Sequence, residues 1–420
     1  MSKLLLFIES NTTGTGMLAL RKAVDWGYTP VFYTNNPDRY AGLDHTGCIV
    51  HCCDTNDVPA LLTTIANTTD SHNVCGITTT SEFYLYHVAT IAAHYGLPGN
   101  SIQAVEQARN KAATRRVLAA AGVRQPHYRI VDDSEQLLNA VQAIGLPCIV
   151  KPVDDSGSND VRLCTSVDEV KAKAEQIWAV TTNMRGQQKS REILIEQYVQ
   201  AAEYSVESLS WQGETNILGI TQKSLAGLPF FVESGHVFPA PLTKEQEQHI
   251  QQTVLQALQA IGFRSGAAHT EIKLTEEGCT IIEINGRLAG GMIPELIRLA
   301  TGVDLLEQQI HCSLEGPTIQ RISTTGSAAI RFIMAEHDGM LEKLDGVENA
   351  KQVQGIKSVQ INTQPGKEVR VPQNAYDRLG YVIGYGQTVE AVQSSLEQAL
   401  EQLTIVIQEK AHDKLHDHAF

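Results

Sequence analysis

Short apolar runs alternate with segments of helical spacing through the first hundred residues, and this alternation limits the fold more than any other feature of the chain. Residues 4–8 and 29–34 are strand-like, and apolar side chains recur at helical spacing over residues 17–26 between them. The pattern continues with strand-like residues 48–51 and 74–78 and helical residues 58–66 and 82–95. Parallel strands need helical crossovers of this kind. The sequence therefore predicts a doubly wound parallel sheet of the α/β class.

The polar turn at residues 11–16 raises the question of a bound dinucleotide, because it carries glycines directly after the first predicted strand. Ala19 stands where the third glycine of the dinucleotide-binding pattern would be, and no acidic residue clearly ends the second strand. Such a fragment is weak evidence without its context. Dinucleotide binding is therefore the less favoured interpretation of this turn.

Charge and composition exclude several classes of protein. The 420 residues suffice for two or three domains, and the net charge of −14, with no compensating basic stripe, argues against a nucleic-acid scaffold. No apolar stretch is long enough to span a membrane, and the eight cysteines show no Cys-x-x-Cys spacing. We expect a soluble cytoplasmic protein with reduced thiols that binds neither nucleic acid nor membranes.

Two glutamates face each other in a predicted hairpin. Residues 267–274 and 279–285 are strand-like and are separated by turn residues. With the turn centred between them, Glu271 lies opposite Glu283, and a bulge at Gly278 would shift this register by one residue.

Alternation along the second strand places Asn285 and Arg287 on the same face as the two glutamates. Carboxylates crowded together need a cation, and oxygen ligands suit a Mg²⁺ ion that bridges substrate phosphates. An exposed hairpin with charged cross-strand neighbours is the alternative, and the hairpin alone does not decide between the two.

A second group of signals begins at Lys151, which ends a buried strand and is followed by a small-residue loop at residues 154–161. A lysine at a strand end can reach a phosphate, and the backbone amides of Ser156, Gly157 and Ser158 can close over phosphate oxygens. An ordinary hairpin loop is the alternative.

The strand at residues 193–199 leads into a short connection before Glu203. Backbone carbonyls and carboxylates at such a strand exit could hold an adenine and a ribose. Taken singly, Glu196 or Glu203 would more often be surface charges. Their position after the lysine and its loop is what favours a nucleotide site.

The order of these motifs resembles the ATP-grasp superfamily, and specifically its L-amino-acid ligase branch. The likeness runs from about residue 4 to residue 408. The motifs that carry it are Asn110-Lys111, Val150-Lys151-Pro152 with the loop after it, Glu196-Gln197-Tyr198-Val199, Glu203-Tyr204-Ser205-Val206-Glu207, residues 234–241, His269-Thr270-Glu271 and residues 283–291. Two departures are Asn110 in place of a common aspartate and Gly286 in place of a frequent proline, and neither removes an expected ligand.

The resemblance implies an ATP-grasp fold with an α+β lid. The implied divisions are an N-terminal Rossmann-like domain at residues 1–110, a small ATP-grasp subdomain with a phosphate flap at 111–195, and a large subdomain at 196–420. The large subdomain would include a C-terminal lid region at about residues 320–410.

The resemblance also implies roles at the nucleotide. Lys111 and Lys151 match the lysines that contact ATP phosphates, and Glu203 matches the ribose-binding carboxylate. The residues implied to bind ATP are Lys111, Lys151, Ser156, Gly157, Ser158, Glu196, Gln197, Tyr198, Val199 and Glu203. The implied Mg²⁺ ligands are Glu271, Glu283 and Asn285, with two ions expected and Mn²⁺ able to replace them.

Further residues are implied to meet the amino-acid substrates. Arg287 matches the cation that stabilises the acyl phosphate and its tetrahedral successor, and Glu82 would meet the amino group of the first amino acid. The substrate residues are Glu82, His236, Arg287, Gly290 and Gly291, and the catalytic residues are Arg287, His236 and Lys151. Gly291 replaces a bulky residue of this branch, which predicts a roomier first-substrate pocket. The general base stays open between His236 and His269.

The implied activity is an ATP-dependent carboxylate-amine ligation through an acyl phosphate, giving a dipeptide or a peptide-like natural product such as an antibiotic, with ADP and phosphate. The partners would be amino acids and ATP, and a homodimer is left open. Two alternatives are an ATP-grasp enzyme of another branch, such as a carboxylase or a purine-pathway enzyme, and an ATP-binding regulator without turnover. The chain has no biotin-attachment Met-Lys-Met segment.

Overall fold

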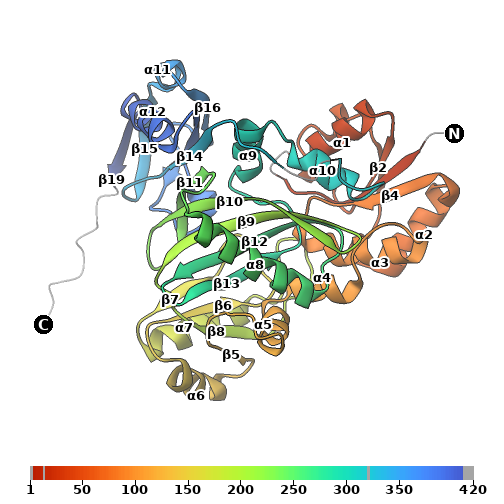
Figure 1. The fold of residues 1–420 in the computed structure, drawn as a ribbon, viewed down its shortest axis with the longest axis horizontal. Coiled ribbons are helices and arrows are strands. Elements are labelled where there is room, and N and C mark those ends of the chain that lie inside the picture. The colour runs from red at the N-terminus through yellow and green to blue at the C-terminus, as the bar shows by residue number, and fades with distance from the viewer. Residues whose placement is uncertain (1–2, 13–14, 319–321, 410–420) are drawn as a thin grey trace, which may run out of the picture.

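The computed structural model describes residues 3–12, 15–318 and 322–409, so two residues of the turn at 11–16 lie outside the described part. Four β-sheets are formed in that part, and Figure 1 shows them as an N-terminal unit, a small lower unit, a large central sheet and a C-terminal unit. Among the described residues, no helix has both the length and the apolar character needed to cross a membrane.

The N-terminal sheet confirms the predicted parallel architecture. Its strands run in the order β3-β2-β1-β4 and pair in parallel. They are β1 (Leu4–Ile8), β2 (Thr29–Thr34), β3 (Ile49–Cys52) and β4 (Val74–Thr78). Side chains of β1 alternate between two cores: Leu5 and Phe7 pack with α1 (Thr15–Asp25) and α10 (Leu305–His311), whereas Leu6 and Ile8 pack with α2 (Val58–Thr68) and α3 (Leu85–Tyr95). The helices therefore cover both faces of the sheet, as a doubly wound fold requires.

A dinucleotide would bind at the carboxyl edge of this sheet. The buried carboxylate of Glu9 lies at this edge, directly after β1. Thr55 donates to it at 2.6 Å, and the backbone amide of Asn35 donates at 2.7 Å. Arg185 reaches this edge from the small lower unit and donates to the Ser10 carbonyl at 2.6 Å. A buried negative charge repels phosphate, so the edge does not favour a dinucleotide.

The small lower unit is an antiparallel sheet in the order β5-β8-β6-β7, flanked by helices. Its elements are α5 (Lys111–Ala120), β5 (Tyr128–Val131), α6 (Ser134–Ile144), β6 (Cys148–Pro152), β7 (Arg162–Cys164), α7 (Val167–Ala179) and β8 (Ile193–Gln197). The helix α4 (Ile102–Arg109) leads into it. Its core packs α6 and α7 against β6 and β8.

The large central sheet has the order β13-β12-β9-β10-β11-β14-β18-β16. Its first five strands are β9 (Ala202–Trp211), β10 (Glu214–Ala226), β11 (Val232–Phe238), β12 (Gly266–Thr275) and β13 (Gly278–Asn285). The helix α8 (Lys244–Ile261) covers one face, where Ile250, Val254 and Leu258 pack against Ile272 (Figure 1). A capping box formed by Thr243 and Gln246 starts this helix, and Gly262 ends it. The charged side chains of the same strands occupy the opposite face.

The C-terminal unit continues the central sheet and adds a second sheet in the order β17-β15-β19. Its elements are α9 (Ile293–Thr301), β14 (Ser327–Ile333), β15 (Gly339–Asp345), α11 (Val347–Gln352), β16 (Ile356–Ile361), β17 (Glu368–Val369), β18 (Gly380–Gly386), α12 (Val389–Glu401) and β19 (Thr404–Glu409). The sequence pattern in this region predicts strands at residues 328–334, 369–372 and 379–384 and a helix at 388–403. The first and third strands and the helix are confirmed, whereas the second overlaps the two-residue strand β17 only at Val369.

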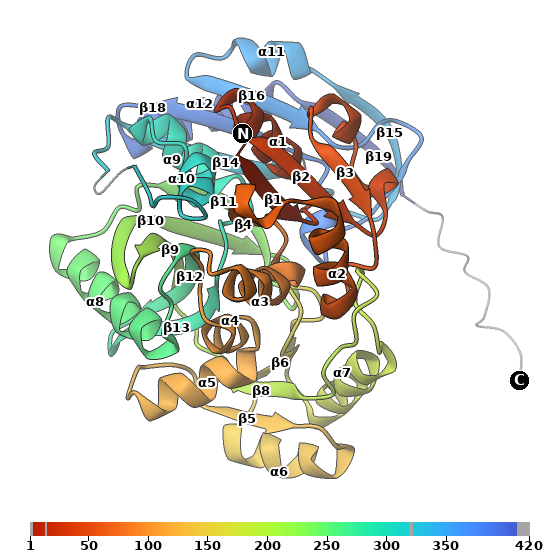
Figure 2. The ribbon, with the colours of Figure 1, turned by 90° about the vertical axis from the view of Figure 1, so that its right-hand side faces the viewer.

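The three predicted divisions stay a proposal. The parallel sheet ends at Thr78, the small sheet spans residues 128–197, and the central sheet begins at Ala202. The strand β8 (Ile193–Gln197) crosses the proposed boundary between residues 195 and 196. Figure 2 shows the small unit below the central sheet, with the N-terminal unit close to both.

Candidate active site

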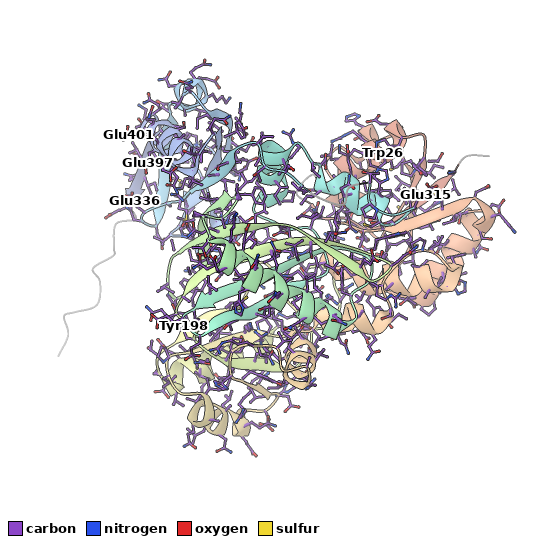
Figure 3. All side chains as sticks on the ribbon, viewed as in Figure 1. Trp26, Tyr198, Glu315, Glu336, Glu397 and Glu401 are labelled. Carbon is purple, nitrogen blue, oxygen red and sulfur yellow. The ribbon has the colours of Figure 1, made fainter. Side chains whose placement is uncertain are left out.

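A cavity of about 820 Å³, partly open to solvent, lies between the small sheet and the charged face of the central sheet. Figure 3 places Tyr198 where these two units meet. The predicted site residues that line the cavity are Lys111, Lys151, Ser156, Ser158, Glu196, Gln197, Tyr198, Val199, Glu203, Glu271 and Glu283. Those outside its lining are Glu82, Gly157, His236, Asn285, Arg287, Gly290 and Gly291.

The hairpin of β12 and β13 pairs Glu271 directly with Glu283, as predicted. The predicted position of the bulge is wrong. The register shifts beside Glu271, so Ile282 is the extra residue, and Gly278 keeps its regular pairing with Thr275. Arg115 donates to the Ile282 carbonyl at 2.7 Å and so satisfies the backbone that the bulge exposes. Without this bulge, Glu283 would not face Glu271.

Basic side chains of the protein contact both glutamates. Lys111 Nζ lies 3.2 Å from Glu283 Oε1, and Lys223 Nζ lies 2.7 Å from Glu271 Oε1. His269 Nε2 lies 3.3 Å from the same oxygen of Glu271. Burial would raise the pKa of Glu271, but the charges of Lys223 and His269 hold it well below its usual range.

The oxygen donors fit a Mg²⁺ ion, since carboxylate and amide oxygens are its preferred protein ligands. Glu271 and Glu283 supply two carboxylates side by side, and Asn285 is buried opposite His269 in the same ladder. In the described part of the chain, no three acidic, histidine or cysteine side chains form a group that could hold a metal ion. Two carboxylates and one amide leave coordination positions for phosphate oxygens and water.

Lys151 is held by a buried ion pair that the sequence did not reveal. Its Nζ lies 2.7 Å from Glu196 Oε2, and Arg115 Nε lies 2.6 Å from Glu196 Oε1. Burial would raise the pKa of Glu196, but Arg115 and Lys151 lower it to about 2. The Glu196 side chain is therefore committed to these cations, which leaves the backbone of residues 197–199 to meet a base. Arg115 follows Lys111 by four residues on the same helix, so both side chains lie on one helix face. This spacing was the sequence signal that could have placed Arg115 at the site.

One end of the cavity is apolar and aromatic. Ile149, Tyr198 and Phe231 line it, and the rings of Tyr198 and Phe231 have centroids 5.8 Å apart. Lys273 Nζ lies over both rings and donates to the Val199 carbonyl at 2.9 Å. A planar heteroaromatic base fits against such apolar walls, with backbone groups beside it.

Lys223 is the second residue that sequence reasoning missed. Its Nζ contacts Glu203 at 2.9 Å and Glu233 at 3.0 Å besides Glu271, and the side chain is buried. These contacts follow from strand register, since Lys223 pairs with Glu203 on β9. In the sequence, Lys223 is a single lysine within the segment that forms β10. Its carboxylate neighbours lie on other strands and become known only from the order of strands in the sheet.

The predicted flap has a left-handed backbone at three residues, of which Ser158 lines the cavity. Gly157, Ser158 and Asp160 have φ values of 69°, 59° and 60°, a region that residues other than glycine rarely adopt. Lys111 Nζ donates to the Asp155 carbonyl at 2.6 Å, and Lys189 Nζ lies 2.9 Å from Asp155 Oδ2. Successive turns of this kind expose backbone amides to an anion.

Arg287 and Glu82 form an ion pair beside the cavity, with Arg287 Nε 2.8 Å from Glu82 Oε2. Burial would lower the pKa of Arg287, but the carboxylates of Glu82, Glu283 and Glu271 raise it. The two residues come from different units, because Glu82 follows β4 and Arg287 follows β13. Glu82 thus fixes the position of Arg287 in addition to its predicted role at an amino group.

His236 is fully buried, and neither ring nitrogen has a hydrogen-bond partner. A Cβ atom added to Gly291 would lie 2.6 Å from His236 Nε2, whereas one added to Gly290 would meet nothing within 4 Å. The lack of a side chain at Gly291 therefore makes room for His236. The predicted extra space at Gly291 is already filled, and open space is found at Gly290.

His269, the other candidate base, has both ring nitrogens engaged. Nδ1 lies 2.7 Å from Glu207 Oε1, and Nε2 faces Glu271. Burial would lower the pKa of His269, but these two carboxylates raise it to about 9.

Two family descriptions match the chain. One is the ATP-grasp domain, over residues 144–295, and the other is the L-amino acid ligase C-terminal domain 2, over residues 331–408. Together they cover more than half of the chain and include Lys151, Glu196, Glu271 and Glu283.

Curated relatives agree with this assignment. An uncharacterized protein of Sinorhizobium fredii, y4rH, is 30% identical over 403 residues, which is 96% of this chain and 83% of that protein. An alanine–anticapsin ligase of Bacillus subtilis is 27% identical over 287 residues, or 64% of this chain and 60% of that protein. The chain thus spans less than two thirds of that ligase's length.

Solved structures share the fold. The L-amino acid ligase of Bacillus licheniformis superposes with a TM-score of 0.79 at 23% identity, covering 97% of this chain and 99% of that chain. A phosphoribosylglycinamide synthetase of Anaerococcus prevotii gives a TM-score of 0.71 at 18% identity, covering 97% and 100%. At these identities the structures establish the architecture alone.

Proposed function

The chain belongs to the L-amino-acid ligase branch of the ATP-grasp superfamily, and from this premise we propose that it joins an amino acid, or an amino-acid-like acid, to a second amino acid. The products are a dipeptide or peptide-like compound, ADP and phosphate. The match of the C-terminal domain favours this branch over the carboxylase and purine-pathway alternatives.

One observation carries the proposal. Lysines and carboxylates from separate elements line a single cavity, one end of which is apolar and aromatic. Lys111, Lys151, Glu271 and Glu283 come from α5, β6, β12 and β13 and line the same space. Cations for phosphates and oxygen ligands for a metal ion are what phosphoryl transfer requires. A regulator without turnover would need only the residues that bind ATP, and not those that promote transfer of its phosphoryl group.

The proposed position of ATP follows the polarity of the cavity. The base lies against the apolar wall that includes Tyr198 and Phe231, beside the backbone of residues 197–199. The ribose meets Glu203, and the phosphates extend toward Lys111 and Lys151. Ser156, Gly157 and Ser158 cover the phosphates with backbone amides.

Glu271, Glu283 and Asn285 would hold Mg²⁺. The ion, when bound, supplies charge neutralisation to the phosphates and helps align the transferred group. Lys111 and Lys223 lie against the same carboxylates and add positive charge at that end of the cavity.

The first step transfers the γ-phosphoryl group of ATP to an oxygen of the first substrate's carboxylate, and ADP leaves. Arg287 lies at the end of the hairpin with its guanidinium fixed by Glu82, so it can stabilise the acyl phosphate. In the second step the amine of the second amino acid attacks the acyl carbon, and phosphate leaves with the bonding electrons of the broken C–O bond.

The attacking ammonium must first lose a proton, and His236 is our choice for the group that accepts it. Neither nitrogen of His236 has a hydrogen bond, although Nε2 lies 3.6 Å from Glu233 Oε2, whereas the nitrogens of His269 lie 2.7 and 3.3 Å from carboxylate oxygens. A base needs a free lone pair within reach of the proton. His269 is then a positioning residue for Glu271.

Water must be excluded while the acyl phosphate exists, because its hydrolysis would waste ATP. The loop at residues 154–161 is placed to do this, since Asp155 is tied to Lys111 and Lys189. We place the reaction in the cytoplasm, in keeping with the free state of all eight cysteines.

A screen over pairs of amino acids with ATP and Mg²⁺ tests the proposal, with phosphate release as the signal and mass spectrometry to identify products. We expect ADP, phosphate and a dipeptide-like product from at least one pair. Release of AMP and pyrophosphate would exclude the acyl-phosphate route. Absence of product from every pair would exclude the ligase activity itself.

A further inference from the structure

Arg378 is a residue of the C-terminal unit with intermediate burial, and its side chain, 9% exposed, contacts Glu233 on the central sheet. It follows the short turn Ala375–Asp377, and its guanidinium lies 3.7 Å from the centroid of the Phe332 ring. Its NH2 group donates to Glu233 Oε2 at 3.0 Å. The nitrogen Nε is buried and has no hydrogen-bond partner. A buried polar atom without a partner costs free energy, so a purely structural arginine would be expected to satisfy it.

Arg378 and His236 converge on one oxygen atom. His236 Nε2 lies 3.6 Å from Glu233 Oε2, the same atom that Arg378 contacts. His236 is fully buried with both nitrogens free, and its ring packs edge-on against Phe332. A cation and a base with unused hydrogen-bonding capacity therefore lie side by side.

This cluster adjoins the proposed reaction centre. The other oxygen of Glu233 contacts Lys223, which in turn contacts Glu271. On the other side, a Cβ atom at Gly291 would lie 2.6 Å from His236 Nε2 and 3.4 Å from Glu233 Oε2, and Gly291 follows Arg287 by four residues. The segment that carries Arg287 thus runs directly into the cluster.

From this arrangement we propose that Arg378 binds the α-carboxylate of the second amino acid, the one whose amine attacks. The inference rests on the proposed ligase activity and adds the position of the second substrate. A carboxylate accepts hydrogen bonds from guanidinium donors that are not already in use, of which Nε is one, and arginine suits this better than lysine because its donors form a planar fork.

The same geometry selects α-amino acids as second substrates. An α-amino acid carries its amine and its carboxylate on one carbon atom, so the base and the cation that serve them must be close neighbours. His236 and Arg378 meet this condition through their shared contact with Glu233. Glu233 also offers a carboxylate to the ammonium before it loses its proton.

The test uses the pair of substrates found in the screen, and compares the full-length wild type with Arg378→Met and Arg378→Lys. Steady-state kinetics are measured with the second amino acid and with its carboxamide, which keeps the amine and removes the charge. Arg298→Met is the matched control, because Arg298 forms a partly exposed pair with Glu295 on α9. The Arg378→Lys variant keeps the buried charge if Arg378→Met fails to fold.

For Arg378→Met we expect KM for the second amino acid to rise about a hundred-fold, with KM for ATP and for the first amino acid unchanged. The wild type should prefer the second amino acid over its carboxamide by a similar factor, and the variant should lose that preference. Arg378→Lys should raise the same KM about ten-fold, since it loses the fork. Arg298→Met should match the wild type.

An unchanged KM for the second amino acid in both Arg378 variants overturns the inference and leaves the ligase activity standing. An equal rise in KM for ATP also overturns it, because the residue would then act on the site as a whole. A wild type that forms no product with any pair overturns the proposed function, and the inference with it.

Discussion

Lys223 Nζ lies 2.7 Å from Glu271 Oε1, which places a lysine cation directly on a carboxylate expected to hold Mg²⁺. The same amine contacts Glu203 and Glu233, so one buried lysine balances three carboxylates from three strands. Burial would lower the pKa of Lys223, but these carboxylates raise it well above its usual value. One side chain thus links three carboxylates on the charged face of the central sheet.

We expect Lys223→Met to destabilise the free protein by about 3–5 kcal/mol, the range for removing one partner of a buried ion pair. The three carboxylates would repel each other without the lysine. Mg²⁺ should then raise the melting temperature of the variant more than that of the wild type, because an ion that binds only the folded state stabilises it. Thermal unfolding with and without millimolar Mg²⁺ measures both effects.

Lys343→Met is the control for this variant, because Lys343 forms an exposed pair with Asp345. Pairs of that kind contribute about 0–1 kcal/mol. Equal Mg²⁺ responses in the wild type and Lys223→Met would show that Lys223 does not compete with a cation at Glu271.

Glu283→Gln should lower turnover by about a hundred-fold or more while leaving the fold intact, since even the loss of a group that only hydrogen-bonds a metal ligand costs about 10–100-fold. The substitution keeps the shape of the side chain and removes its charge. Glu277→Gln is the matched control, because Glu277 lies in the turn of the same hairpin and pairs with the partly exposed Arg124. Phosphate release and circular dichroism provide the two measurements, and a fully active Glu283→Gln would refute the metal role.

Periodicity predicted the elements that are regular and buried. The parallel sheet was recognised because each of its strands is a short apolar run flanked by a helix with a clear apolar stripe. The strands β15 (Gly339–Asp345) and β19 (Thr404–Glu409) were missed, because charged side chains such as Glu342 and Lys343 interrupt their apolar pattern on exposed faces. Half-exposed strands whose apolar pattern is interrupted carry too little signal to be identified without their neighbours.

The site was predictable where chemistry is local in sequence. Glu271 and Glu283 lie on one hairpin, so their pairing follows from the turn, although the bulge at Ile282 was placed at Gly278. Glu233 and Arg378 are 145 residues apart and meet only because β11 and the C-terminal unit share a sheet. No local pattern encodes such a contact.

Glu82→Gln separates two roles for this carboxylate, which bonds Arg287 at 2.8 Å. If Glu82 binds the amino group of the first amino acid, the loss of charge raises KM for that substrate alone. If it mainly positions Arg287, kcat falls as well, because the acyl phosphate loses a fixed cation. We expect both changes, and initial-rate kinetics over the first amino acid resolve them. Unchanged KM and kcat would exclude both proposed roles of Glu82.

Arg185→Ala should loosen the phosphate flap from a distance. Arg185 is buried and bonds the Ser10 carbonyl and the Tyr40 hydroxyl of the N-terminal unit. The same loop continues to Lys189 and Ser190, which bond Asp155 and Asp154 at the start of the flap. Losing Arg185 releases one end of this connection.

Hydrogen exchange measures the effect, with faster exchange expected in residues 154–161 and 181–190 of Arg185→Ala. Arg191→Ala is the control, because Arg191 lies close in sequence but bonds the Asp132 carbonyl at an exposed position. Equal exchange of the flap in the two variants would mean that the flap moves independently of the N-terminal unit.

Gly291→Ala should impair the enzyme through His236. Gly291 has φ of 58°, and the added methyl group would lie 2.6 Å from His236 Nε2. The ring has to move, and misplacing a reacting group by about 1 Å can cost about a hundred-fold in rate. Gly302→Ala isolates the backbone contribution, because Gly302 has φ of 77° and nothing within 4 Å of the added atom. Both variants should lose about 1–2 kcal/mol from the left-handed backbone.

The stability loss of Gly291→Ala beyond that of Gly302→Ala should shrink when His236 is also changed to alanine, because the clash is then removed. Activity should not return in that double variant, since the proposed base is gone. Denaturant unfolding and phosphate release together separate the two consequences. If Gly291→Ala were as active as Gly302→Ala, the position of His236 would not matter to the reaction, and the assignment of His236 as the base would have to be abandoned.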